Sequence, residues 1–357
     1  MGFKCGIVGL PNVGKSTLFN ALTTSKKAQA ENFPFCTIDP NVGIVAVPDE
    51  RLNTISKISK SKKTINAAIT FVDIAGLVKG ASKGEGLGNK FLSHVREVDT
   101  IIHLIRCFDS EKIQNVNKDV NPIRDVEIIE TEILLSDLDS LQKRLEKSNK
   151  KKLDKEEIIF LEECQKLIEN GTRPDELKKK YSKDLIKKSA LLSLKPRIIV
   201  CNVDEKSLPN GNKYSDICKK KFSNENIIVI CADIEDQIMN LVESERKDFM
   251  LESGIKKTGL DNLIKKGYDT LGLSTFFTSG PEESRAWTIE KNSKAADAAG
   301  VIHTDFKKKF IRAETVTHED FIKYKGFNEC KNAGKLRLEG KDYSVNDGDV
   351  MYFRVGS

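Results

Sequence analysis

The sequence predicts an α/β protein in which a parallel sheet carries a helical insertion and is followed by a small β-rich domain. Three observations lead to this fold class. Apolar, β-rich runs alternate with helical patterns, as in βαβ units with right-handed crossovers. The alternation stops between about residues 126 and 194, and the texture of the chain changes again after about residue 273. A chain of 357 residues is long enough for two or three domains.

Five apolar, β-rich runs are the predicted strands of the sheet: residues 3–9, 68–72, 100–106, 197–201 and 227–231. The first helical pattern begins at Lys15 and runs to Thr23. Because parallel strands end at one edge of a sheet, the polar motifs that follow these strands are expected to meet at one ligand site.

The insertion, residues 126–194, is predicted to be an antiparallel pair of helices. Apolar residues recur there at steps of three and four, which is a helical period: Ile128, Ile129, Ile133, Leu134, Leu138, Leu141 and Leu145. A second helix is expected near residues 155–168, before a turn at residues 170–174. Residues 143–188 hold 15 Lys and Arg against 10 Asp and Glu, which is most of the net charge of +6. Two interpretations stay open, a solvated helix face or an arm that contacts nucleic acid.

Beyond residue 273, strand-like pieces at residues 285–289, 343–345 and 350–355 surround a short helix near residues 303–310. This pattern predicts a separate α+β domain.

Composition restricts the class of protein further. No run of 18 apolar residues occurs, so no membrane span is expected. The chain enters an apolar strand at Phe3, which leaves no room for a signal peptide. None of the eight cysteines forms a CxxC pair, so neither a zinc site nor a disulfide framework is expected, and the compartment should be the reducing cytoplasm. Cys36 falls in a predicted loop, and two interpretations stay open: its thiol is inert, or it can be oxidised.

The strongest motif is Gly9-Leu10-Pro11-Asn12-Val13-Gly14-Lys15-Ser16, which matches G-x-x-x-x-G-K-[ST] between a strand and a helix. Such a loop wraps main-chain N–H groups around phosphates at a helix N-terminus. Lys15 is expected to reach the β- and γ-phosphates, and the Ser16 hydroxyl to coordinate Mg²⁺. The motif therefore predicts binding of a nucleoside triphosphate.

The strand at residues 68–72 leads into Asp73-Ile74-Ala75-Gly76-Leu77. Asp73 is expected to hold Mg²⁺, through a water ligand, and Gly76 to offer its N–H to the γ-phosphate. Ras-type GTPases carry Gln after this glycine to orient the attacking water, and Leu77 cannot do so. Unassisted hydrolysis should therefore be slow.

Thr37 lies between these two motifs. Its hydroxyl is expected to complete the Mg²⁺ shell when the γ-phosphate is present, as in an order–disorder switch. Lys15, Thr37 and Gly76 are thus the predicted catalytic residues around the γ-phosphate. A second switch is expected after Leu77, in a glycine-rich segment. In some P-loop GTPases an Asn at the position of Asn12 helps to hold a K⁺ ion, and the sequence leaves a K⁺ requirement open.

Base recognition departs from the guanine pattern N-K-x-D. The strand at residues 197–201 is followed by Asn202-Val203-Asp204-Glu205. Val203 lacks the long stem and ammonium of Lys, and Glu205 is one methylene longer than Asp. Loss of the bidentate contact to guanine costs about 1–3 kcal/mol of preference, so ATP should be favoured or tolerated. Asn202 can still bond the P-loop or the base edge.

These motifs closely resemble those of the Obg-like ATPases, the YchF family of translation-factor-class P-loop proteins. The resemblance covers nearly the whole chain: residues 9–17 (GLPNVGKST), 32–41 (NFPFCTIDPN), 73–89 (DIAGLVKGASKGEGLGN), 202–205 (NVDE), 285–289 (RAWTI), 302–306 (IHTDF) and 339–351 (EGKDYSVNDGDVM).

The resemblance implies an OBG-type G domain at residues 1–125 and 195–273, a coiled-coil insertion at 126–194 and a C-terminal TGS domain of β-grasp type at 274–357. It also implies hydrolysis of ATP in preference to GTP and association with ribosomes, with contact to rRNA left open. By motif match, six residues would hold the phosphates: Asn12, Val13, Gly14, Lys15, Ser16 and Thr17. Ser16 and Thr37 would hold Mg²⁺, and the backbone of Val203, next to Asn202, would contact adenine.

Family members often carry a His upstream of a Val-Asn-Pro segment, and Asn115 takes that place here. Of the four histidines, His94 is the best remaining candidate for a catalytic role. Two other classes stay open: a nucleotide-gated scaffold whose turnover is incidental, and a conventional GTPase of the Obg group.

Overall fold

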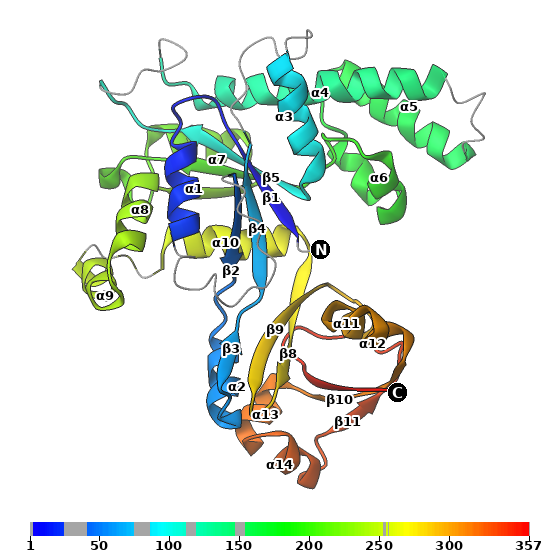
Figure 1. Ribbon diagram of the computed structural model, residues 1–357. Coiled ribbons are helices and arrows are strands. Elements are labelled where there is room, and N and C mark those ends of the chain that lie inside the picture. The colour runs from blue at the N-terminus through cyan, green and yellow to red at the C-terminus, as the bar shows by residue number, and fades with distance from the viewer. Residues whose placement is uncertain are drawn as a thin grey trace.

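Two six-stranded sheets organise the molecule (Figure 1). The computed structural model describes residues 3–24, 41–74, 86–111, 119–146, 154–252, 255 and 257–356. The first sheet, with its helices, forms the upper part of the molecule in Figure 1, and the second forms the lower part.

The first sheet has the strand order β2-β4-β1-β5-β6-β7. Its strands are β1 (Lys4–Val8), β2 (Val42–Ala46), β4 (Ala68–Asp73), β5 (Thr100–Arg106), β6 (Arg197–Asn202) and β7 (Asn226–Ile230). The five predicted strands are confirmed, and they pair in parallel. The sequence analysis did not predict β2, which adds an antiparallel edge beside β4.

Helices cover both faces of this sheet. They are α1 (Lys15–Thr24), α3 (Gly86–Glu97), α7 (Lys213–Lys221), α8 (Ala232–Asn240) and α10 (Gly259–Thr270), and α9 (Glu243–Glu252) packs on α8. Alternate residues of β6 face opposite ways, so Ile198 and Val200 share a core with Leu263 of α10, whereas Ile199 and Cys201 pack on the side of α7. The sheet is therefore buried on both sides, as its continuous apolar strands require.

The insertion contains the two predicted helices. They are α4 (Pro122–Glu146) and α5 (Lys155–Glu169), followed by the 3₁₀ helix η3 (Pro174–Lys179) and α6 (Lys183–Ser189). Helices α4 and α5 pack together along an apolar seam that includes Leu141 and Phe160, both fully buried. The buried carboxylate of Asp137 accepts hydrogen bonds from the backbone N–H groups of Leu192 and Ser193 at 2.9 and 2.7 Å. This contact ties α4 to the chain that returns to β6.

The second sheet has the order β11-β10-β12-β8-β9-β3. Its strands are β3 (Lys63–Ile65), β8 (Leu273–Ser279), β9 (Glu283–Glu290), β10 (Phe310–Val316), β11 (Arg337–Glu339) and β12 (Val350–Val355). Helix α11 (Ala295–Ile302) packs on one face through Ala298 and Ala299, against Phe276 and Phe353. A helix lying across a mixed sheet is the β-grasp arrangement that the resemblance implies.

The other face of the second sheet is covered from both ends of the chain. Helix α2 (Glu50–Ser59) packs there beside α13 (His318–Tyr324), near α14 (Phe327–Asn332), and β3 pairs in parallel with β9. Arg51 of α2 donates to Asp347 at 2.7 Å and lies over the ring of Phe277. Residues 50–65 thus leave the first sheet between β2 and β4, join the second sheet and return, an excursion that the sequence did not indicate.

One of two local expectations for the C-terminal part is wrong. Residues 343–345 form no named strand, because their backbone groups bond to residues 293 and 295 and to a turn at Gly340 instead of to the sheet. The short helix expected near residues 303–310 is confirmed as α12 (Thr304–Lys308), and Phe310 already begins β10.

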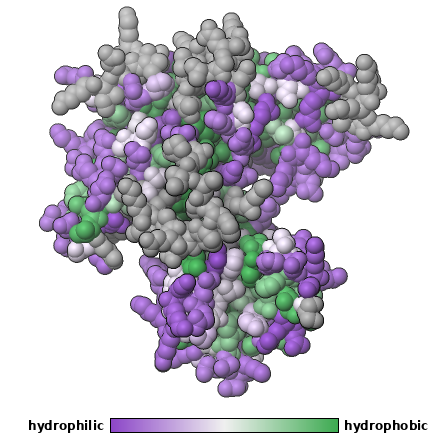
Figure 2. Space-filling model, in the orientation of Figure 1, coloured by the Kyte–Doolittle hydropathy of each residue, from purple (hydrophilic) through white to green (hydrophobic). Residues whose placement is uncertain are grey.

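Polar side chains dominate the face of the molecule seen in Figure 2. Among the described residues, no helix combines the length and the apolar character needed to cross a membrane.

Candidate nucleotide site

The glycine loop lies between β1 and α1, as the sequence predicts. β1 ends at Val8 and α1 begins at Lys15, where the N–H of Leu18 donates to the carbonyl of Gly14 at 3.0 Å. Gly14 has a φ of +93°, in the left-handed region that favours glycine. A Cβ on Gly9 would lie 2.7 Å from the carbonyl oxygen of Leu104, so this position also has no space for a side chain.

The sheet register brings Asp73 to the mouth of this loop. β4 runs parallel to β1 with Asp73 opposite Ile7, and the N–H of Ile74 donates to the carbonyl of Ile7 at 3.1 Å. The ammonium of Lys15 lies 2.7 Å from a carboxylate oxygen of Asp73 and 2.7 Å from the carbonyl oxygen of Ile74. The predicted phosphate ligand and the predicted metal ligand are therefore in direct contact.

This ion pair is largely shielded from water. The side chains of Lys15 and Asp73 are 13% and 16% exposed. Ser16, the next residue of the helix, is exposed, and Asn12 is also exposed with a left-handed φ of 64°. The first turn of α1 contains no acidic residue that would oppose an anion at the helix N-terminus.

Asn202 bonds the P-loop. Its side-chain N–H donates to the carbonyl of Val13 at 2.9 Å, and its side-chain oxygen accepts from the N–H of Ala232 at 2.9 Å. Asn202 is 5% exposed, so both hydrogen bonds are inside the protein. A peptide group is planar, with its N–H and C=O on opposite sides. By holding the Val13 carbonyl, Asn202 therefore turns the N–H of Gly14 the other way.

The two substituted positions of the base motif differ in their surroundings. Val203 is 2% exposed, and its N–H donates to the carbonyl of Ile230 at 2.8 Å. The backbone contact to adenine that the resemblance implies therefore could not use the N–H of Val203, which is already bonded. Glu205 begins a short 3₁₀ helix (Glu205–Ser207) and is exposed.

Five residues to which the sequence analysis assigns a role or state lie outside the described part of the chain: Cys36, Thr37, Gly76, Leu77 and Asn115. The sequence reasoning missed the carbonyl of Ile74 as a partner of Lys15, and the N-terminus of α8 as the second anchor of Asn202. The one sequence signal for the contact between Asn202 and α8 was the presence of an Asn at the start of the base motif.

The histidines show no catalytic arrangement in the described residues. His103 is buried in β5, and burial, together with the charges of Arg197 and Arg173, lowers its pKa to about 3. Its Nε2 has no partner among the described residues. His94 is exposed on α3.

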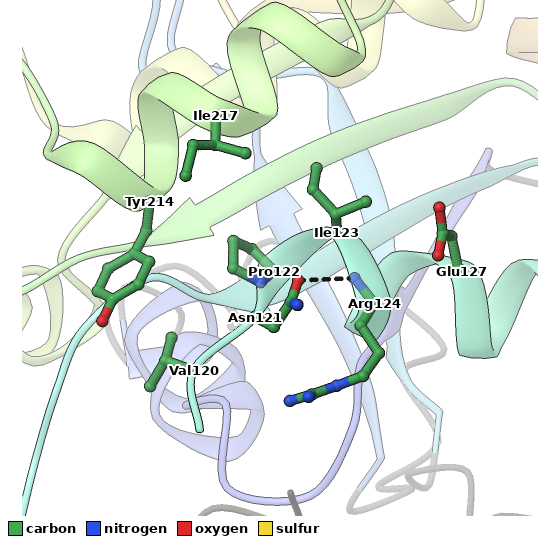
Figure 3. Close-up of a pocket in the computed structure, with 8 residues that line it drawn as sticks. All are labelled: Val120, Asn121, Pro122, Ile123, Arg124, Glu127, Tyr214 and Ile217. Atoms are coloured by element: carbon green, nitrogen blue, oxygen red, sulfur yellow. Dashed lines mark hydrogen bonds between the residues drawn. The ribbon is translucent and has the colours of Figure 1, made fainter. Parts of the chain in front are cut away.

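A second hollow lies where α4 and α7 begin (Figure 3). It has a volume of about 420 Å³ and is lined by Val120, Asn121, Pro122, Ile123, Arg124, Glu127, Tyr214 and Ile217. The side chain of Asn121 accepts from the N–H of Arg124 at 3.1 Å at its floor. None of the predicted nucleotide residues that the structure describes lines this hollow.

A glycine loop between a buried strand and a helix, with Lys15 and Asp73 at its mouth, defines a P-loop nucleotide-binding protein of the GTPase fold. Residues 4–137 match a family profile described as "50S ribosome-binding GTPase", and residues 273–356 match the C-terminal domain of YchF GTPases, described as a protein of unknown function. The chain belongs to the YchF family.

Individual relatives support this assignment over the full length. The ribosome-binding ATPase YchF of Escherichia coli O157:H7 is 49% identical over 362 residues, and that of Bacillus subtilis (strain 168) is 49% identical over 365 residues; each alignment covers 99% of both proteins. The solved structure of the Schizosaccharomyces pombe YchF GTPase has 39% identity and a TM-score of 0.84, and the match covers 99% of this chain and 98% of that chain. Some of these relatives are named ATPase and one is named GTPase, so their names do not decide between adenine and guanine.

Proposed function

We propose that this chain is a ribosome-binding ATPase that binds ATP with Mg²⁺ at the P-loop, hydrolyses it slowly to ADP and changes its ribosome affinity with nucleotide state. The observation that carries the proposal is the contact between Lys15 and Asp73 at the mouth of the glycine loop. This contact brings together the ammonium of Lys15, which would bind the phosphates, and the carboxylate of Asp73, which would bind the metal. The names of the full-length relatives supply the ribosome and ATP. Because ribosomes are the proposed partner, we propose that the protein functions in the cytoplasm.

The donor set at the mouth of the loop fits Mg²⁺, which prefers oxygen ligands. The carboxylate of Asp73 and the exposed hydroxyl of Ser16 supply such oxygens, and Thr37 would add a third. When bound, Mg²⁺ neutralises charge on the phosphates. On binding, Lys15 would exchange Asp73 for phosphate oxygens, which frees that carboxylate for the metal.

The surroundings of the base motif favour adenine over guanine. Guanine selection in GTPases needs a carboxylate that accepts from N1 and N2. Glu205 is exposed and carries its carboxylate one methylene farther out than Asp. Val203 is buried in the apolar core, so it covers no base with a long stem. Adenine has no N–H groups at the positions of guanine N1 and N2, so the missing carboxylate costs it no hydrogen bond.

Slow turnover follows from what surrounds the γ-phosphate. Leu77 takes the place at which Ras-type GTPases orient the attacking water, and Asn115 replaces the family histidine. Gly76 and Thr37 would still contact the γ-phosphate. A K⁺ ion held with the help of Asn12 would supply the positive charge that an arginine finger provides elsewhere.

The insertion keeps only part of its positive charge available for contact with rRNA. Several of its basic side chains pair with carboxylates of the same unit: Arg144 with Glu157, Arg173 with Glu130 and Asp175, Lys178 with Asp175 and Lys180 with Glu163. These pairs favour the solvated, internally neutralised helix face over a wholly RNA-binding arm. Lysines such as Lys179 and Lys183 stay exposed for phosphate contacts.

The test is the ATPase rate of the purified chain with and without ribosomes, in Na⁺ and in K⁺ buffers. We expect ribosomes to raise the rate, K⁺ to raise it further, and ATP to bind more tightly than GTP in titration calorimetry. The Lys15→Ala variant is the control for contaminating ATPases. Nucleotide-dependent ribosome binding without faster turnover would indicate a scaffold, and GTP binding about tenfold tighter than ATP would refute the reading of Val203 and Glu205.

A further inference from the structure

Three cysteines that are far apart in the sequence meet beside the base motif. Cys107 follows β5, Cys201 belongs to β6 and Cys218 to α7. Their sulfur atoms all lie within 4.8 Å of one another, and all three residues are 0% exposed. The irregular spacing of the eight cysteines gave no sign of this cluster.

The spacing is close to that of a three-sulfur ligand set. Three sulfurs bound to one atom at about 2.3 Å lie roughly 3.5–4 Å apart. Shifts of less than about 1 Å would therefore bring the three sulfurs onto one centre. Among the described residues, no His, Asp or Glu joins the three cysteines in a larger group. The cluster thus offers three soft ligands and no fourth, which disfavours tetrahedral Zn²⁺.

The apolar surroundings of the three cysteines favour a bound ion whose charge balances that of the thiolates. The cluster packs in a core with Ile105, Val126, Ile199 and Val203. Three bound thiolates carry three negative charges. A monovalent ion would leave two of them uncompensated, a divalent ion one and a trivalent centre none. Because an uncompensated charge in such a core costs several kcal/mol, a trivalent thiophile fits best.

We propose that Cys107, Cys201 and Cys218 form a binding site for trivalent arsenic, taken up as arsenous acid. Each thiol sulfur forms a bond to arsenic and displaces one hydroxide, which leaves as water with the thiol proton. One As(OH)₃ and three thiols therefore give one As(S-Cys)₃ and three waters, with no change in oxidation state. The product is neutral.

Hydrogen bonds from the Cys107 and Cys201 thiols lower the pKa of Cys218, whereas hydrogen bonds with its two thiol neighbours, followed by burial, raise the pKa of Cys107. Thiolate is the form that binds a soft centre. Because all three side chains are enclosed, α7 has to move before arsenic can enter, and uptake should be slow.

The occupied site would act on the nucleotide site. The N–H of Cys107 donates to the carbonyl of Asn202 at 2.8 Å, Cys201 precedes Asn202 in β6, and Val203 packs in the same core as the three cysteines. Drawing three sulfurs onto one atom shifts the ends of β5 and β6, and with them the side chain of Asn202 that holds the P-loop. Arsenic should therefore weaken ATP binding.

The experiment incubates the full chain with sodium arsenite under a phosphine reductant, since dithiols would compete for arsenic. After desalting, mass spectrometry counts arsenic per chain, X-ray absorption counts its sulfur neighbours, and calorimetry gives the ATP dissociation constant. We expect one arsenic with three sulfurs and a severalfold weaker ATP affinity.

Two variants, Cys218→Ala and Cys201→Ala, should each lower arsenic affinity at least tenfold, so that a folding defect in one leaves the other as a test. Cys164→Ala and Cys330→Ala, which remove buried cysteines from other cores, are the matched controls and should bind arsenic as the natural chain does. Two-sulfur coordination, equal binding by all four variants, or Cd²⁺ bound more tightly than arsenic would overturn the proposal.

Discussion

Replacing Asn202 by alanine tests the physical link between the base motif and the P-loop. The change removes two buried hydrogen bonds, one to the carbonyl of Val13 and one from the N–H of Ala232. Leaving a buried donor or acceptor without a partner costs about 1–3 kcal/mol. Together the two groups should lower the free energy of unfolding by about 2–6 kcal/mol.

The same change should weaken nucleotide binding. Without Asn202, the peptide between Val13 and Gly14 is free to rotate, so the N–H of Gly14 no longer points steadily to the phosphate side. A hydrogen bond to a charged group contributes about 1.5–3 kcal/mol, so loss of one corresponds to roughly 10- to 150-fold weaker binding of Mg-ATP.

Urea denaturation gives the stability and titration calorimetry gives the affinity. Asn226→Ala is the matched control, because it removes an amide hydrogen bond, to Thr270 at 3.0 Å, at the start of β7 and away from the loop. It should cost about 0.5–1.5 kcal/mol of stability and leave ATP affinity unchanged. An Asn202→Ala protein that binds ATP as tightly as the natural chain would refute the reasoning.

Three further predictions concern the same sheet. Lys15→Ala should weaken Mg-ATP binding by about 100-fold in calorimetry, since the ammonium is the proposed phosphate ligand; unchanged affinity would remove Lys15 from the site. The double variant Val203→Lys, Glu205→Asp should raise the affinity for GTP relative to ATP by about tenfold in competition titrations, and an unaltered ratio would show that other groups choose the base. His103 has its pKa lowered to about 3, whereas an unfolded His titrates near 6.5. As pH falls below about 6.5, the unfolded chain gains a proton that the folded chain does not, so stability should fall by up to ~1.4 kcal/mol per pH unit until about pH 3. His103→Gln should reduce this slope in urea titrations between pH 7 and 5, and exposed His94→Gln should not; equal slopes in all three proteins would contradict the assignment.

The sequence by itself determined the elements and the chemistry that depend on neighbours along the chain. Five strands of the first sheet, the two long helices of the insertion and the glycine loop were predictable, because periodicity and motif spacing are local properties. Asp73 was predictable for a related reason. It ends a strand, and parallel strands deliver their ends to one edge of the sheet.

Only the tertiary structure decided the contacts between distant segments. Local patterns carry no information on strand pairing across hundreds of residues, so β3 gave no sign that it pairs with β9 of the second sheet. The choice of Asn202 between loop and base, and the meeting of Cys107, Cys201 and Cys218, likewise depend on how β5, β6 and α7 pack. Residues 343–345 have a strand-like composition, but their hydrogen bonds go to residues 293 and 295, because backbone groups bond the partners that the fold brings near.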